Sequence, residues 1–198
     1  MLELVLIRHG ETAGNQCPTA LGITDLPLNE KGRRQASTLA RVFALEKPEA
    51  IYSSPLVRAE ETAIMIAKLH NMAVVPMQDL MERNFGFWEN LAVDKIRSEY
   101  PQEYAEWKND LAGYQIPGGE SAKSHYDRLI TAIDGLLEKH TEGRVILVTH
   151  LGCIRHILAY LLGMGIEGSW HFAANTGSIC RVRIDENKNG VLTSFNEI

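Results

Sequence analysis

The sequence is poor in cysteine and has no long hydrophobic run. Its three cysteines, Cys17, Cys153 and Cys180, are odd in number and widely spaced, which argues against a disulfide framework and against a CxxC metal site. No stretch approaches the roughly 20 apolar residues that span a bilayer. The apolar N-terminal run is interrupted by Glu3 and Arg8, so it is too short for a signal peptide. We therefore expect a soluble, cytoplasmic protein with no membrane contact.

The chain also lacks an excess of positive charge. It has 20 Lys and Arg against 25 Asp and Glu, for a net charge of −5. We therefore expect no nucleic-acid partner, and an anionic substrate would need a local basic site. A length of 198 residues with 45% hydrophobic residues suits one compact domain. The oligomeric state stays open, a homodimer included.

Short apolar runs alternate with helical stretches along most of the chain. The expected strands are 2–7, 50–52, 73–75, 145–149, 179–184 and 191–195, and the expected helices are about 29–46, 55–70, 120–140 and 151–163. Ser54 is a candidate N-cap, with Pro55 as the first residue of its helix. The alternation predicts an α/β three-layer sandwich with a mainly parallel central sheet and helices on both faces.

One segment interrupts this alternation. Residues 80–140 are less regular and contain a clear break at Pro117-Gly118-Gly119. We therefore expect a single domain over 1–198, with a core of about 1–79 and 141–198 and an inserted helical cap of about 80–140.

Two of the expected strands end in the same way. The strand before His9 and the strand before His150 each deliver a histidine at the carboxyl end, where ligands bind in open parallel sheets. Arg8 lies beside His9, and Arg58 lies in the first turn of the helix after the second strand. Two histidines and two arginines at strand ends predict an oxyanion pocket in an otherwise acidic protein.

These residues belong to a longer series of ordered blocks. The blocks are Leu6–Thr12 with Asn15, Gly22–Leu28, Lys31–Gly32, Gln35–Ala36, Ser53–Ala59, Thr62–Ala63, Glu82 with Phe85–Glu89, Pro117–Ser121 and Val148–His150. In their content and order the chain resembles the histidine phosphatase superfamily, also called the phosphoglycerate mutase-like family. The resemblance covers nearly the whole chain.

The resemblance implies a role for each matching residue. His9 would be the phosphorylated nucleophile, and Glu82 would donate a proton to the leaving oxygen. Arg8, Asn15, Arg58 and His150 would hold the phosphoryl group. Thr12, Gly22 and Leu151 are further candidates for substrate contacts.

The chemistry explains why these groups are needed. A phosphate monoester is strongly anionic, so a neutral imidazole attacks it more easily than an anion, provided that its other nitrogen donates its proton to a fixed acceptor. Nearby arginines should keep His9 neutral and stabilise charge on the transferring group. Glu82 must carry a proton when the ester bond breaks. We expect no cofactor and no metal, because the sequence contains no HxH, HExxH or paired-cysteine motif.

The substrate is less constrained than the chemistry. Compared with the family pattern, Gly14, Glu61, Asn90 and Leu151 are departures that change the shape of the pocket rather than its catalytic groups. The expected partner is a small-molecule phosphate ester. The aromatic residues at 85–89, Trp107 and 170–172 are similar to α-ribazole 5′-phosphate phosphatases of cobalamin biosynthesis and could stack on a benzimidazole. His125, in the cap, is by default a packing residue that could approach the substrate.

Three alternatives stay open. A phosphoglycerate mutase-type transferase shares the site, but the chain ends at Ile198, just after its last strand, which favours hydrolysis. A broad-specificity phosphatase is the second alternative. A non-catalytic module that binds a phosphorylated ligand is the third and the least favoured.

Overall fold

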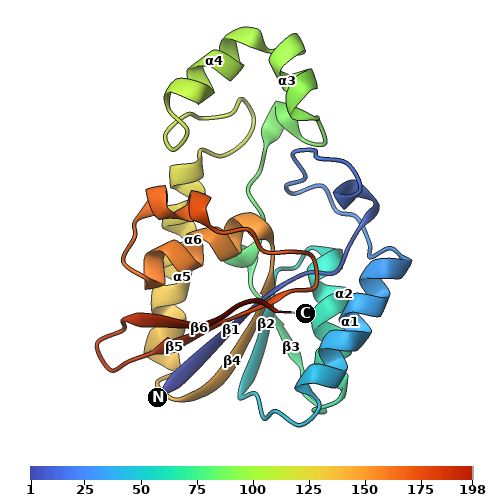
Figure 1. Ribbon diagram of the computed structural model, residues 1–198, viewed down its shortest axis with the longest axis vertical. Coiled ribbons are helices and arrows are strands. Elements are labelled where there is room, and N and C mark those ends of the chain that lie inside the picture. The colour runs from blue at the N-terminus through green and yellow to red at the C-terminus, as the bar shows by residue number, and fades with distance from the viewer. Residues whose placement is uncertain (198) are drawn as a thin grey trace.

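A six-stranded sheet forms the centre of the molecule (Figure 1). The computed structural model describes residues 1–197. The strands are β1 (Leu2–Arg8), β2 (Ala50–Ser53), β3 (Val74–Pro76), β4 (Gly143–Thr149), β5 (Ile179–Ile184) and β6 (Gly190–Glu197). They are arranged in the order β3-β2-β4-β1-β5-β6. The strands β3, β2, β4 and β1 are parallel to one another, β5 runs antiparallel to β1, and β6 runs antiparallel to β5. The predicted mainly parallel sheet is therefore confirmed.

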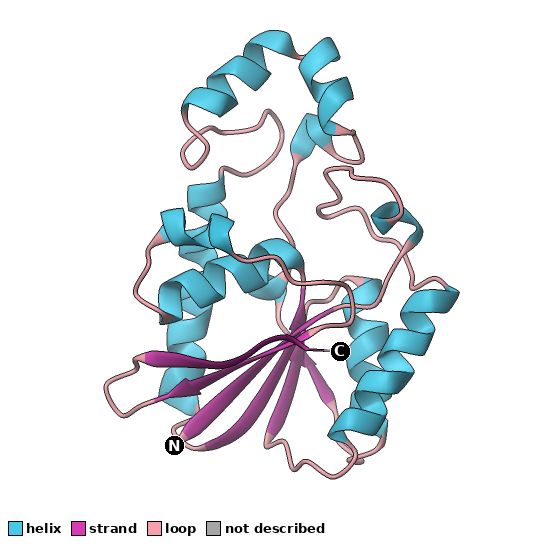
Figure 2. Ribbon diagram, viewed as in Figure 1, coloured by secondary structure: helices cyan, strands magenta, loops and turns pink. Residues whose placement is uncertain are grey.

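Helices cover both faces of this sheet (Figure 2). The α-helices are α1 (Glu30–Phe43), α2 (Val57–Lys68), α3 (Val93–Glu99), α4 (Pro101–Asn109), α5 (Ala122–Lys139) and α6 (Leu151–Leu161). Short 3₁₀ helices occur at Ala13–Asn15, Gln78–Leu80, Gly86–Trp88 and Ile166–His171. Within residues 1–197, no helix has both the length and the apolar character that a bilayer crossing demands.

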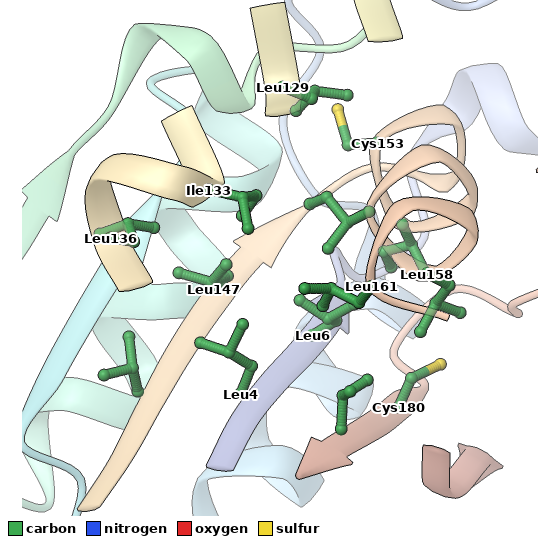
Figure 3. Packing of buried hydrophobic residues seen from close by; sticks show 14 of the residues in the cluster. Leu4, Leu6, Leu129, Ile133, Leu136, Leu147, Cys153, Leu158, Leu161 and Cys180 are labelled. Atoms are coloured by element: carbon green, nitrogen blue, oxygen red, sulfur yellow. The ribbon is translucent and has the colours of Figure 1, made fainter. Parts of the chain in front are cut away.

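The pleat of β1 divides the core into two halves. Leu4 and Leu6 belong to a buried cluster with the inner faces of α5 and α6 (Figure 3), whereas Val5 and Ile7 pack with α1 and α2 on the other side. Successive strand residues point to opposite faces, so an uninterrupted apolar strand fills two cores at once. This packing supplies the rigid frame from which the strand ends project.

Helix α2 begins later than predicted. Its N-cap is Leu56, which makes no side-chain capping bond, so the prediction of Ser54 as N-cap is wrong. The Ser54 hydroxyl instead lies within hydrogen-bond distance of the His150 ring and accepts from the Leu56 N–H. Helix α1 begins as expected, because the Asn29 side chain accepts from the Gly32 N–H at 2.8 Å.

The expected cap, 80–140, contains two structurally different parts. Helices α3 and α4 lie farthest from the sheet (Figure 1) and share a small aromatic cluster around Trp88, Ile96 and Ile116. Helix α5 instead contributes Leu129 and Ile133 to the main core (Figure 3). The apolar face of α5 therefore belongs to the layer that covers the sheet.

Candidate active site

His9 lies at the carboxyl end of β1 and is only 3% exposed. Its Nδ1 is 2.7 Å from the carbonyl oxygen of Gly10. Because a carbonyl can only accept, Nδ1 carries the proton and Nε2 keeps its lone pair. Burial, together with the charges of Arg58 and Arg8, holds the pKa of His9 well below its ordinary 6.5. The ring is therefore neutral at neutral pH, with one nitrogen able to act as a nucleophile.

His150 lies beside it, at the end of the neighbouring parallel strand. Arg8 and Thr149 are paired in register, and the centroids of the two histidine rings are 5.1 Å apart. Arg58 Nε donates to His150 Nδ1 at 3.2 Å, so the ring proton is on Nε2, which donates to Ser54 Oγ at 2.8 Å. Burial and then the charge of Arg58 lower the pKa of His150 well below 6.5. Both nitrogens of this neutral ring are thus engaged.

Arg58 is completely buried, and each of its three nitrogens makes a hydrogen bond. Nη1 donates to the Thr24 carbonyl and Nη2 to the Gly22 carbonyl at 2.6 Å. The lack of a side chain at Gly22 lets this segment pack against Arg83, since a Cβ there would lie 2.1 Å from the Arg83 carbonyl oxygen. The carbonyl of Gly22 therefore positions Arg58, and the structure shows no role for Gly22 in lining the pocket described below.

Thr12 is also buried, and it forms hydrogen bonds to the side chain of Asn15. Its N–H and its hydroxyl both donate to Asn15 Oδ1 at 3.0 Å. The Asn15 carbonyl oxygen is thereby occupied, and its amide NH₂ is the group left for a ligand. Thr12 thus positions Asn15 rather than lining the pocket.

Glu82 is 7% exposed and is held by main-chain donors. Its Oε1 accepts from the Arg83 N–H and its Oε2 from the Gly152 N–H, both at 2.9 Å. Gly152 is required for this contact, because a Cβ there would lie 2.3 Å from Oε1. The carboxyl group is therefore hydrogen-bonded to the first turn of α6, two residues after His150.

These groups adjoin a pocket of about 300 Å³. Of the predicted residues, Arg8, Asn15, Glu82 and Leu151 line it. His9 and His150 lie almost completely buried at the neighbouring strand ends, and Arg58 is buried in the first turn of α2. Arg8 donates through Nη1 to the Ala174 carbonyl, while its buried Nε has no partner among residues 1–197. An unpaired buried guanidinium N–H suits an incoming anionic oxygen.

Further cationic and aromatic residues complete the pocket. They are Arg83, Phe85, Trp107, His125, Arg155, His156 and Trp170. Arg83 is buried, one of its terminal nitrogens has no partner among residues 1–197, and burial lowers its pKa to about 10, so it stays cationic. Three arginines therefore face one pocket in an acidic protein.

A second pocket of about 320 Å³ opens within the aromatic cluster of the cap. It shares Arg83, Phe85 and Trp107 with the first pocket, and Trp88, Tyr104 and Ile116 extend it. The two pockets are therefore adjacent, one cationic and one apolar.

One group of side chains has donor atoms close enough together to bind a metal ion. Donor atoms of Glu82, His125 and Cys153 lie within 4.8 Å of one another. These residues are far apart in the sequence and form no spacing motif, so inspection of the sequence could not bring them together.

Several residues of the site were missed in the sequence. Ser54 contacts His150, and Thr62 Oγ1 accepts from the Gly10 N–H at 3.1 Å while donating to the Arg58 carbonyl. Arg155 and His156 come from α6. Ser54 and Thr62 lie in the family-like blocks Ser53–Ala59 and Thr62–Ala63, which already indicated that both residues belong near the site. Their contacts depend on chain segments that meet only in the fold.

Comparison with known proteins agrees with this geometry. The profile of the histidine phosphatase superfamily (branch 1) matches residues 4–197. Phosphoserine phosphatase 1 of Hydrogenobacter thermophilus is 30% identical over 97% of this chain and 91% of that protein. Phosphoglycerate mutase-like protein 4 of Arabidopsis thaliana is 38% identical over 78% of this chain and 69% of that protein.

A solved structure is also similar over its whole length. The α-ribazole phosphatase from Shigella flexneri superposes with a TM-score of 0.91 at 30% identity, covering 98% of this chain and 96% of that one. The chain therefore belongs to the histidine phosphatase superfamily. The expectations of this family, this fold and an enzyme are confirmed.

Proposed function

We propose that this chain hydrolyses a small-molecule phosphate monoester through a phosphohistidine on His9. The observation that carries the proposal is the bond from His9 Nδ1 to the Gly10 carbonyl, which leaves Nε2 as the nucleophilic nitrogen of a neutral ring. Arg8, which lines the adjoining pocket and has an unpaired buried N–H, supports it.

In the first step, His9 Nε2 attacks the phosphorus atom in line with the ester oxygen. The N–P bond forms as the P–O ester bond breaks, and Glu82 transfers its proton to the departing oxygen. Arg8 and the Asn15 amide bind the phosphoryl oxygens. Arg58 contributes its charge and holds His150 through Nε.

In the second step, water replaces the alcohol. The Glu82 carboxylate accepts a proton from this water as its oxygen attacks phosphorus, and the N–P bond breaks to release phosphate and neutral His9. Neither of these two chemical steps requires a metal ion.

For the substrate we favour an alkyl phosphate whose leaving alcohol carries a flat aromatic base, with α-ribazole 5′-phosphate as the leading candidate. The apolar pocket beside the cationic one supports this choice, because Phe85 and Trp107 line both. The name of the Shigella flexneri structure points to the same substrate. A flat benzimidazole buried against aromatic rings gains stacking and burial energy.

Trapping the intermediate tests the mechanism. Brief incubation with substrate followed by a quench in alkali should give acid-labile, alkali-stable phosphate on the peptide that contains His9. Full phosphatase activity in His9→Ala would refute the mechanism.

A substrate panel tests the specificity, run without added metal and again with chelator. We expect α-ribazole phosphate to exceed sugar phosphates and phosphoglycerate in kcat/KM. Trp107→Ala should raise KM for α-ribazole phosphate and leave KM for phosphoglycerate unchanged. Equal rates across the panel would exclude the specific substrate while leaving the mechanism intact.

A further inference from the structure

The cluster of Glu82, His125 and Cys153 joins three parts of the chain next to the pocket. His125 belongs to the first turns of α5, Cys153 to the first turn of α6, and Glu82 to the segment before Gly86. His125 and Cys153 are completely buried. Glu82 and His125 both line the cationic pocket, so an ion that enters this pocket can reach the cluster.

The separations between donor atoms are those of a small tetrahedral site. His125 Nε2 is 3.5 Å from Cys153 Sγ, and the Met81 carbonyl oxygen is 3.3 Å from Nε2 and 3.2 Å from Sγ. Glu82 Oε1 is 4.0 Å from the same Nε2. Zinc bonds of about 2.0 Å to nitrogen and about 2.3 Å to sulfur place tetrahedral ligands roughly 3.3–3.7 Å apart. To complete the site, the Glu82 carboxylate must move toward the imidazole, so that the 4.0 Å between Oε1 and Nε2 shortens to about 3.4 Å.

The donor types select the metal. One thiol, one imidazole and one carboxylate form a mixed soft and borderline set, which suits Zn²⁺ and not Mg²⁺ or Ca²⁺, since those ions prefer oxygen ligands alone. Nδ1 of His125 has no hydrogen-bond partner among residues 1–197, so it can carry the ring proton while Nε2 binds an ion.

We propose that Glu82, His125 and Cys153 bind one Zn²⁺ ion per chain, and that this ion inhibits the enzyme by holding the Glu82 carboxylate. The inhibitory part rests on the proposed role of Glu82 as proton donor. On binding, the Cys153 thiol proton is released to solvent and an Sγ–Zn bond forms. The His125 ring proton, which Nε2 donates to the Met81 carbonyl, moves to Nδ1 through solvent exchange, and an Nε2–Zn bond forms. Glu82 Oε1, once bound to the ion, can no longer transfer a proton to a leaving group.

Metal binding can be measured separately from activity. The full chain, stripped with chelator, is titrated with Zn²⁺ against a chromophoric competitor, and the titration is repeated with Co²⁺ to look for thiolate-to-cobalt charge-transfer absorption. We expect one site with cobalt–thiolate absorption. Cys153→Ser, whose hydroxyl can still donate to the Met81 carbonyl, should weaken Zn²⁺ binding at least ~10-fold and abolish that absorption.

The other two cysteines supply matched controls. Cys180→Ser changes another completely buried thiol that lies in the main core, and Cys17→Ser removes an exposed thiol. Both variants should bind Zn²⁺ as the parent does. Equal Zn²⁺ affinity of Cys153→Ser and the parent, or no binding by the parent, would overturn the site.

The inhibition is then measured against each variant's own zinc-free rate. Zn²⁺ should inhibit the parent and Cys180→Ser at a concentration that leaves Cys153→Ser active, and Mg²⁺ should inhibit none of them. Zinc binding through Cys153 without loss of phosphatase rate would overturn the inhibitory role. A chain with no phosphatase activity in the absence of metal would instead refute the proposed function, while the titrations would still decide the metal site.

Discussion

His9 and His150 occupy matching positions at the ends of adjacent parallel strands, yet their surroundings differ. His9 donates to the carbonyl of its own neighbour, Gly10, and Nε2 makes no hydrogen bond to residues 1–197. His150 is held on both nitrogens, by Arg58 and by Ser54. The same local sequence pattern therefore produces one ring with a free lone pair and one ring that is fixed. The difference is imposed by the segments that pack above each strand end.

Substituting each histidine in turn should separate the role of His9 as nucleophile from the stabilising role of His150 most clearly. We expect His9→Ala to lower kcat by ~10⁴ or more and to abolish the acid-labile phosphate, because no other group supplies the nucleophile. His150→Ala should lower kcat by ~10²–10³ and still form the intermediate, since it removes stabilisation only. Rapid-quench kinetics with labelled substrate measure both. A phosphorylated His9→Ala enzyme would contradict the assignment.

Glu82 extends the comparison, since it is tied through Gly152 to the helix that follows His150. Glu82→Gln should lower the rate on an alkyl phosphate by ~10²–10³. A nitrophenyl phosphate should be almost unaffected in the phosphorylation step, because its leaving group departs without a proton. Burst kinetics on the two esters test this, and equal losses on both would argue against proton donation.

Ser54 should have a smaller effect, exerted through His150. Ser54→Ala removes the acceptor of the His150 Nε2–H, and one hydrogen bond of about 1 kcal/mol corresponds to a ~5-fold lower kcat. Ser53→Ala is the matched control, because Ser53 is equally buried but donates only to the Ser54 carbonyl. Steady-state kinetics on the two variants suffice. A larger loss in Ser53→Ala would exclude the positioning role.

The smallest effect concerns stability and pH. Burial, with help from Arg83 and Arg155, lowers the pKa of His156 to about 4. Below pH 6.5 the unfolded chain binds a proton at this residue that the folded chain does not, so stability is lost as pH falls from 6.5 toward 4. The loss reaches ~1.4 kcal/mol per pH unit for each such histidine.

Urea denaturation between pH 7.5 and pH 5 measures this slope at about half-unit intervals. His156→Asn, which can still bond Ser169, should reduce the slope, whereas a substitution at the exposed His171 should not. His9, His125 and His150 add to the slope, because their pKa values are also held well below 6.5. A stability independent of pH over this range would contradict the assignment of neutral buried rings.

Much of the site could be predicted because it depends on strand ends. The apolar runs before His9 and His150 require buried parallel strands, and parallel strands deliver their carboxyl ends to one edge of the sheet. Arg58 follows from the same rule. Thr12 and Gly22 were expected to contact substrate, but their bonds run to Asn15 and Arg58. A motif specifies which residues matter but not which neighbour each one contacts.

Hydrophobic periodicity and strand polarity are local properties, so the amino-acid order is enough to predict the sheet, its alternation with helices and the convergence of histidines and arginines. The protonated nitrogen of each histidine, the contact of Ser54 with His150 and the proximity of Cys153 to Glu82 depend on the folded structure. Hydrogen-bond geometry and burial depend on atoms from segments far apart in the chain. Those atoms are placed by the packing of both faces of the sheet, which no local pattern contains.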